Sequence, residues 1–276
     1  LGRLVGPCGL LGTIRYDDGR ERVPAPLTTP GGPMLYHWLG RMVANGCRDG
    51  TAQVARGFQG RVPGLKVLEQ AQGSKPLALT AGDGAAQVDL RAFLDADCRL
   101  TKGVLAALAR ALARPEATYA GATPVIPRPR SALTRAYARF WQRLPFARSV
   151  APGYGLYAVN AAGRARWGAF PRIISDDTFV RLQFAPEERV QVPDRYDWPM
   201  VEGLAALIRV RRRQDAGVRE LAALFPDLMS REAKPRLAPA DLAGLGLRDP
   251  AGFAVYAAVS LAVRLRRSDG AFTRGR

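Results

Sequence analysis

Histidine and cysteine are scarce in this chain of 276 residues. His37 is the only histidine, and Cys8, Cys47 and Cys98 are the only cysteines. A single histidine argues against catalytic triads that use histidine and against histidine-rich zinc sites. The cysteines lack metal-binding spacing and their number is odd, so we expect a reducing compartment without a framework of disulfides.

The sequence also lacks a hydrophobic run long enough to span a bilayer. The longest apolar run, Ala251–Val263, is shorter than the ~20 residues that a transmembrane helix needs. Arg264, Arg266 and Arg267 follow it, so the run is either a packed helix or a helix lying on an anionic membrane. Since no signal peptide is evident, we expect a cytoplasmic protein, which the second interpretation places on the inner face of the cell membrane.

Acidic residues are the minority among the charged residues. Lys and Arg together number 41 against 24 Asp and Glu, a formal net charge of +17. Such a charge favours anionic partners, such as nucleotides, nucleic acid or an acidic membrane. A nucleic-acid-binding protein would need a clustered basic face with aromatic platforms, or a recognition helix. The arginines are scattered and no such motif is present, so we do not expect a nucleic-acid partner.

Strands and helices are predicted to alternate along most of the chain. Residues 1–38 are rich in Gly and Pro and show no periodic segment, so we expect an irregular or poorly ordered N-terminal segment. Residues 39–230 form the predicted main domain, an α/β domain with a mostly parallel sheet covered by helices on both faces. Residues 231–276 are predicted to form a C-terminal helical tail. The strands are expected near 39–44, 65–68, 88–94, 117–126, 156–159 and 189–192, and the helices near 51–59, 73–86, 105–112, 131–144, 176–184, 202–225 and 251–263.

Two carboxylates follow the strand predicted at 88–94. Asp95 and Asp97 lie one residue apart, at the strand end where open α/β sheets bind their ligands. Carboxylate oxygens on a short turn suit a hard divalent cation, with substrate phosphates as the remaining ligands. An isolated Asp-x-Asp is more often a solvated turn, so this hypothesis depends on the surrounding motifs.

A second carboxylate pair, Asp176-Asp177, follows the apolar dipeptide Ile173-Ile174. Carboxylates are common in the first turn of a helix because they interact favourably with its dipole, so the pair is either a cap or part of a reaction site. About twenty residues upstream, Gly153-Tyr154-Gly155 predicts a turn that either approaches a ligand closely or is merely tight.

Five segments in register resemble the family-two glycosyltransferases with a GT-A fold. The resemblance extends over about residues 39–215 and implies a Rossmann-like α/β domain. The segments are Asn45–Ala52, Gly73-Ser74-Lys75 with Ala78-Leu79, Phe93–Asp97, Gly153–Ala158 and Asp176–Arg181.

The resemblance implies an inverting, metal-assisted transfer of a sugar from a nucleoside-diphosphate sugar to an acceptor hydroxyl. Asp97 would bind Mg²⁺ or Mn²⁺, and Asp95 would share the metal or hold the ribose. Asn45 and Lys75 would contact the nucleotide sugar.

The same resemblance assigns the acceptor side of the reaction. Asp177 would be the general base, with Asp176 as the second choice, and Gly153, Tyr154 and Gly155 would lie near the acceptor. The sequence identifies neither the donor sugar nor the acceptor.

Two family features are missing from the sequence. The first strand of the family ends in a Pro-x-x-Asn-Glu type motif, which residues 1–40 do not contain. The alternative is therefore a catalytically impaired or inactive homologue that binds sugar nucleotides and lacks this strand. The Gln-x-x-Arg-Trp motif of processive synthases is also absent, because Arg211–Gln214 is not followed by Trp, which weakens a polymerising role.

Overall fold

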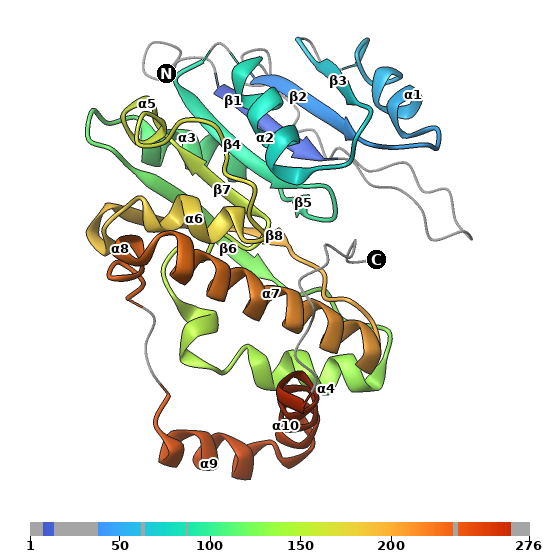
Figure 1. Cartoon of the computed structure of the whole chain (residues 1–276), viewed down its shortest axis with the longest axis vertical. Coiled ribbons are helices and arrows are strands. Elements are labelled where there is room, and N and C mark those ends of the chain that lie inside the picture. Colours follow the sequence, from blue (N-terminus) through green and yellow to red (C-terminus); the bar gives the residue numbers. More distant parts are fainter. Residues whose placement is uncertain (1–7, 14–37, 62–63, 87, 234–236, 266–276) are drawn as a thin grey trace.

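The computed structural model describes residues 8–13, 38–61, 64–86, 88–233 and 237–265. One eight-stranded sheet forms its centre, in the order β3-β2-β1-β4-β7-β6-β8-β5 (Figure 1). The strands are β1 Cys8–Thr13, β2 Trp38–Asn45, β3 Lys66–Gln70, β4 Leu90–Asp95, β5 Arg99–Leu100, β6 Tyr119–Val125, β7 Leu156–Val159 and β8 Arg189–Asp197.

Helices alternate with the strands, as the sequence pattern predicted, and dominate the C-terminal third of the chain. The α-helices are α1 Thr51–Arg56, α2 Lys75–Gly84, α3 Val104–Leu112, α4 Ala132–Trp141, α5 Ala161–Arg164, α6 Asp176–Leu182, α7 Leu204–Leu224, α8 Pro226–Met229, α9 Pro239–Arg248 and α10 Pro250–Leu265. Short 3₁₀ helices occupy Pro145–Arg148 and Pro186–Glu188.

The sheet is mixed rather than wholly parallel. Strands β3, β2, β1 and β4 run parallel to one another, and β6 and β8 also pair in parallel. Strand β7 lies antiparallel between β4 and β6, and the short β5 pairs antiparallel with β8. The predicted α/β class is confirmed. The reversal at β7 brings the segment before this strand to the carboxyl end of β4.

Strand β1 lies at the centre of the sheet, between β2 and β4. This differs from the expectation of an irregular segment over residues 1–38, of which 1–7 and 14–37 lie outside the described residues. Its sequence, Cys-Gly-Leu-Leu-Gly-Thr, has no alternating pattern, and central parallel strands are covered on both faces and commonly lack one. The inactive alternative assumed that the first strand of the family is absent. The structure has a strand, β1, at that place in the chain.

Side chains that alternate along the strands build one apolar core on each face of the sheet. On one face, Phe93 of β4 and Tyr157 of β7 pack with Leu79 of α2 and Phe179 of α6. On the other face, the residues next to these in the strands pack against α3, whose buried side chains include Leu108 and Leu112. Because the side-chain period of a strand is two residues, consecutive strand residues serve opposite cores.

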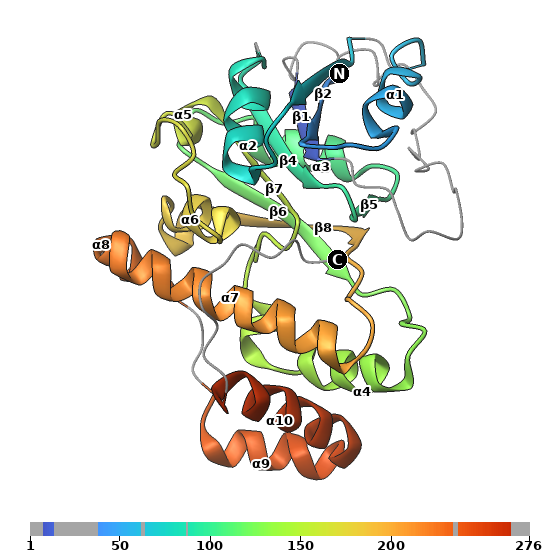
Figure 2. The same ribbon diagram turned by 45° about the vertical axis from the view of Figure 1, so that its right-hand side comes forward.

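Helices α4, α7 and α10 pack together below the sheet (Figures 1 and 2). Phe140 of α4 contacts the rings of Phe253 and Tyr256 in α10. Arg139 donates two hydrogen bonds to the buried carboxylate of Asp249, at 2.7 and 2.8 Å, which fixes the start of α10 against α4. Among the described residues, no helix combines the length and the apolar character that crossing a membrane requires.

Candidate functional site

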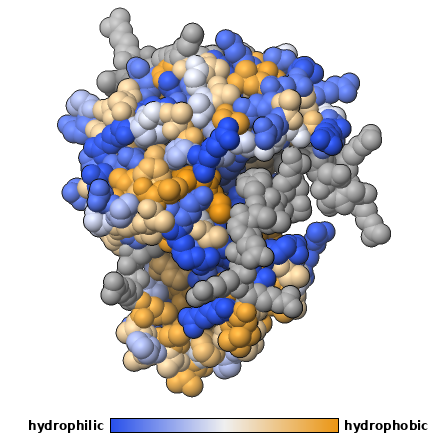
Figure 3. Space-filling view, viewed as in Figure 1, coloured by the Kyte–Doolittle hydropathy of each residue, from blue (hydrophilic) through white to orange (hydrophobic). Residues whose placement is uncertain are grey.

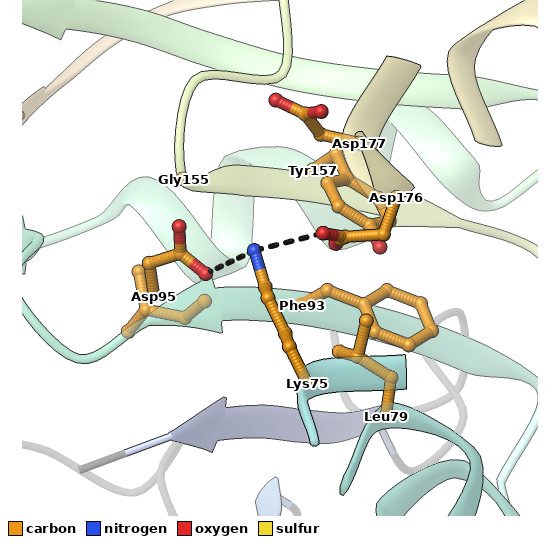
Figure 4. Close-up of a pocket in the computed structure, with 9 residues that line it drawn as sticks. Lys75, Leu79, Phe93, Asp95, Gly155, Tyr157, Asp176 and Asp177 are labelled. Atoms are coloured by element: carbon orange, nitrogen blue, oxygen red, sulfur yellow. Dashed lines mark ion pairs between the residues drawn. The ribbon is translucent and has the colours of Figure 1, made fainter. Parts of the chain in front are cut away.

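The carboxylates and the lysine singled out in the sequence meet at one small cavity above the end of β4 (Figure 4). Strand β4 contributes Asp95, the start of α2 contributes Lys75, the turn before β7 contributes Gly155, and the first turn of α6 contributes Asp176 and Asp177. This is the carboxyl edge of the parallel half of the sheet, where α/β proteins of this kind bind ligands.

Lys75 joins the two carboxylate pairs. Its Nζ lies 3.0 Å from Oδ1 of Asp95 and 3.1 Å from Oδ1 of Asp176 (Figure 4). Burial disfavours the charged form of this lysine, but Asp176 and Asp95 outweigh that effect and hold its pKa above the ordinary value. Lys75 is therefore a fixed cation between the end of β4 and the start of α6.

Asp176 is the more deeply placed of the second pair, with a side chain only 4% exposed. Burial raises the pKa of Asp176 to about 6, although Lys75 opposes the shift. Its Oδ1 faces Lys75, and its Oδ2 is buried without a hydrogen-bond partner among the described residues. A buried carboxylate oxygen without a donor is costly, so Asp176 can accept one further hydrogen bond at this site.

Asp177 points away from Lys75 and lines the same cavity (Figure 4). It is half-buried, and its Oδ1 accepts a hydrogen bond from the Thr178 backbone N–H at 2.7 Å. It forms no salt bridge within the part of the chain that the structure describes. The two adjacent carboxylates thus have different environments, since one is paired and buried and the other is available to a ligand.

Asn45 supports the loop that carries Lys75. Its Oδ1 accepts a hydrogen bond from the Ser74 backbone N–H at 2.7 Å, immediately before Lys75. Next to it, Gly46 has a φ of +64°, and a side chain there would collide with the backbone of Gly73. The structure therefore gives Asn45 a positioning contact, in addition to its predicted place near the nucleotide sugar.

The segment Gly153-Tyr154-Gly155 lies between the two carboxylate pairs. Its glycines have φ values of +78° and +69°, which L side chains rarely adopt. The backbone of Gly153 passes beside Asp177, and that of Gly155 passes beside Asp95. The Tyr154 ring turns away from the cavity and stacks on Trp198, with ring centroids 4.8 Å apart.

Replacing Gly155 by Ala should destabilise the fold by about 1–3 kcal/mol and weaken ligand binding at the cavity. The added Cβ would lie 2.5 Å from Cys98 Sγ and 3.4 Å from Asp95 Cβ, in a strained backbone conformation. Urea unfolding measures the change as a lower midpoint at constant slope. Gly84→Ala is the matched control, because its Cβ meets open space. Equal midpoints for the two variants would contradict the close approach.

Asp97 lies on the same turn as Asp95, closed by a hydrogen bond from the Cys98 backbone N–H to the Asp95 carbonyl at 3.1 Å. Cys98 Sγ approaches Asp97 Oδ1 at 3.8 Å, and burial raises the pKa of this thiol. Asp97 does not line the cavity beside Lys75. The two aspartates are thus held on one short turn, with Asp95 facing Lys75.

Residues that the motifs did not single out also form the cavity. Leu79, Phe93, Leu94 and Tyr157 line it. The Tyr157 hydroxyl is buried and has no hydrogen-bond partner among the described residues. Phe93 and Tyr157 stack with ring centroids 4.8 Å apart, so the floor of the cavity is aromatic. Their place in apolar strands predicted burial but could not show that they lie side by side.

Within the described residues, no group of three His, Cys, Asp or Glu side chains is arranged to hold a metal ion. Asp95 and Asp97 together offer two carboxylates, and the Asp95 side chain is 38% exposed. Mg²⁺ in proteins is commonly bound by one or two carboxylates together with substrate phosphates. The residues therefore fit a cation that is shared with a phosphorylated substrate.

Comparison with known families agrees with this arrangement. Residues 42–165 match the family described as glycosyl transferase family 2. The match includes Asn45, Lys75, Asp95, Asp97 and the Gly153–Gly155 segment, and it ends before Asp176. No curated protein sequence matches the chain.

Solved structures of glycosyltransferases share the fold. A mannosyltransferase from Pyrobaculum calidifontis, solved with GDP-Man and Mn²⁺, is 18% identical with a TM-score of 0.57, over 95% of this chain and 76% of that one. TarS residues 1–349 from S. aureus, solved with UDP-GlcNAc, is 11% identical with a TM-score of 0.51, over 96% and 95% of the two chains. The predicted GT-A fold is confirmed, and the resemblance to family-two glycosyltransferases is confirmed over residues 42–165.

Proposed function

We propose that this chain catalyses an inverting, metal-assisted transfer of a sugar to an acceptor hydroxyl. The premises are its match to glycosyl transferase family 2 and its GT-A fold. The donor is a nucleoside-diphosphate sugar. The observation that carries the proposal is the meeting of Lys75, Asp95, Asp176 and Asp177 around one cavity at the carboxyl edge of the sheet. Cations suit the diphosphate side of such a reaction, and a free carboxylate suits the acceptor side.

In the proposed reaction the acceptor oxygen attacks the anomeric carbon from the face opposite the leaving group. A new carbon–oxygen bond forms, the bond from the anomeric carbon to the diphosphate oxygen breaks, and the electron pair leaves with the nucleoside diphosphate. Asp177 takes the acceptor proton, since a carboxylate that is not held in a salt bridge can act as a general base. Displacement from the opposite face inverts the anomeric centre.

The donor side uses the end of β4 and the start of α2. Asp95 and Asp97 would hold Mg²⁺ or Mn²⁺, which when bound neutralises the charge that develops on the departing diphosphate. Lys75 adds a fixed positive charge beside them, and Asn45 holds the Lys75 loop in place. Asp176 orients Lys75 through the ion pair of 3.1 Å. The aromatic floor made by Phe93 and Tyr157 excludes water below the reacting groups.

A donor screen tests this function directly. Calorimetry with Mn²⁺ and a panel including GDP-mannose and UDP-N-acetylglucosamine should find at least one donor that binds, and a transfer assay should release its nucleoside diphosphate when an acceptor is supplied. UMP and GMP are the matched ligands without a second phosphate, and they should bind more weakly because the metal and Lys75 act on the diphosphate. A folded protein that binds none of these donors would contradict the proposal.

We also propose that the protein is cytoplasmic and that its C-terminal helices contact the inner face of the membrane. Helix α10 buries Gly252 and Val259 yet exposes an apolar stripe on its other side: Ala251, Ala254, Ala258, Leu261 and Leu265. Leu261 and Leu265 are 58% and 75% exposed, and Leu247 of α9 is 84% exposed. Figure 3 shows apolar residues gathered over the end of the molecule that Figure 1 assigns to α9 and α10. Exposed Arg248 and Arg264 lie in the last turns of these helices, which suits anionic lipid.

Vesicle sedimentation should show binding that requires phosphatidylglycerol or phosphatidylserine and weakens as salt is raised. The double substitution Leu261→Glu and Leu265→Glu should abolish binding, because it puts charge into the apolar stripe. Val54→Glu is the control, since Val54 is 54% exposed on α1 at the other end of the molecule (Figure 1). Equal sedimentation with neutral and anionic vesicles would show that α10 is only a packed helix.

A further inference from the structure

A second cavity, of about 270 Å³, adjoins the segment before β7 that also borders the carboxylates. Pro152 lines this cavity, whereas Gly155, three residues along the chain, lines the cavity of Lys75 and Asp177. The end of β6, the end of α4 and the start of the segment after β8 form its other walls. The short segment Pro152–Gly155 therefore borders both cavities, one at each end.

Aromatic rings form one side of this second cavity. Trp141 of α4 and Trp198, just after β8, both line it, with ring centroids 5.5 Å apart. Trp198 also stacks on Tyr154, which fixes the plane of its indole ring. Both tryptophans are only half-buried, although burying the large apolar surface of an aromatic side chain contributes much free energy to a fold. They provide a rigid, partly uncovered ring surface.

Polar groups that lack hydrogen-bond partners among the described residues belong to side chains that line this cavity. The Ser149 hydroxyl is buried and has no hydrogen-bond partner among the described residues. Arg148 donates through Nε to the Gln142 carbonyl at 3.1 Å, and its two terminal nitrogens make no hydrogen bond to another described residue. Neither indole N–H of Trp141 and Trp198 donates within the described part of the chain. The residues that line the cavity include a cation and no carboxylate.

This combination of groups matches a sugar ring. The apolar C–H face of a pyranose packs on an aromatic face, whose negative charge density attracts the polarised hydrogens, while its hydroxyls need donors and acceptors around the edge. Ligand cavities of this type run from about 300 to 1,000 Å³, so a cavity of about 270 Å³ suits one small ring rather than a whole nucleotide sugar. An alkyl chain would leave the buried Ser149 hydroxyl without a hydrogen-bond partner.

We propose that this second cavity is the acceptor subsite, and that it binds a neutral or acidic sugar ring of the acceptor against Trp198 and Trp141. As an acceptor subsite it rests on the proposed function, since Pro152 lines this cavity and the next residue, Gly153, passes beside Asp177. The side chain of Trp198 is the platform, and Arg148 and Ser149 supply hydrogen bonds at the edge. The acceptor is thereby identified as a saccharide rather than a lipid or a small apolar metabolite.

Saturation-transfer NMR on the full chain, without nucleotide or metal, tests sugar binding independently of catalysis. The probes are the methyl glycosides of glucose, galactose, mannose, N-acetylglucosamine and glucuronic acid, with hexanol as an apolar probe. At least one glycoside should receive saturation at its ring C–H protons. Trp198→Leu should weaken this binding about tenfold or more, and Trp198→Phe, which keeps an aromatic platform, should retain most of it.

Arg148→Gln and Arg143→Gln form a matched pair of charge changes. Arg148 lines the cavity, whereas Arg143, close by in the sequence, pairs with Asp249 at 3.5 Å and does not line it. Only the first should weaken glycoside binding. Once a donor and an acceptor are identified, Trp198→Leu should raise the KM for the acceptor and leave the donor affinity unchanged.

Three results would overturn the proposal. They are saturation of hexanol but of no glycoside, equal glycoside binding in Trp198→Leu and the parent protein, and an unchanged acceptor KM in an active Trp198→Leu variant. If glycosides bind at Trp198 but no nucleotide sugar binds, the proposed transferase function fails and the cavity remains a sugar site that is not an acceptor subsite. Failure of the cavity and failure of the donor site are thus distinguishable.

Discussion

Asp177→Asn should slow sugar transfer by roughly 10²–10⁴-fold and leave donor affinity nearly unchanged, because the amide keeps the size of the side chain but cannot take a proton. Asp177 is half-buried, lines the cavity and forms no salt bridge with another described residue. It lies beside the Gly153 backbone, on the side of the cavity that we propose for the acceptor. The measurement is the initial transfer rate together with the donor affinity by calorimetry.

Two further variants separate loss of a base from a change in helix charge. Asp241→Asn removes an exposed carboxylate from the first turn of α9 and should leave the rate unchanged. Asp176→Asn removes one of the two carboxylates that pair with Lys75, so it should slow transfer less than Asp177→Asn while changing the donor affinity. Full activity of Asp177→Asn would show that the base is another group. The largest loss in Asp176→Asn would assign that role to Asp176.

Asp97→Ala should remove the increase in nucleoside-diphosphate affinity that Mn²⁺ produces in the parent protein. The described residues offer no three-ligand metal site, and Asp95 and Asp97 lie on one turn at the end of β4. Mn²⁺ and the diphosphate should therefore bind cooperatively, and each should raise the affinity for the other by roughly 5–150-fold. The reason is that the diphosphate oxygens would supply the metal ligands that the two aspartates do not. Calorimetry should measure the affinities for UDP and GDP with and without Mn²⁺. In the variant, the affinity with Mn²⁺ divided by the affinity without it should be near one.

Asp89→Ala is the matched control, since Asp89 is an exposed carboxylate just before the opposite end of β4. It changes the net charge equally and should keep the full effect of Mn²⁺. An unchanged effect of Mn²⁺ in Asp97→Ala would contradict its role as a metal ligand. Tight binding of Mn²⁺ to the parent protein without any nucleotide would contradict the shared site.

Local sequence patterns predicted most elements of the main domain. The strand that ends in Asp95 and the helix that begins at Asp176 were expected near those positions, because apolar periodicity and helix-capping residues are local signals. The same motifs predicted that Lys75, Asp95, Asp176 and Asp177 share a site, and the structure brings these four together. Their chemical roles were implied by the family resemblance and remain predictions.

Contacts between distant segments could not be predicted in the same way. Strand β1 gave no local signal, because a short strand between two others carries no alternating pattern. Strand β7 lies antiparallel to β4 and β6 because of the path that the chain takes from α4 to β7. Hydrophobic periodicity predicts that a segment is a strand but not its direction in the sheet.

The sequence by itself determined the α/β class, the carboxylate pairs at element ends and the excess of positive charge. Only the tertiary structure decided that Lys75 spans Asp95 and Asp176, and that Trp141 and Trp198 meet in a second cavity. The physical reason is that hydrophobic periodicity and capping act within a few residues, whereas an ion pair or a ring contact between distant segments forms only when packing of the sheet fixes both partners.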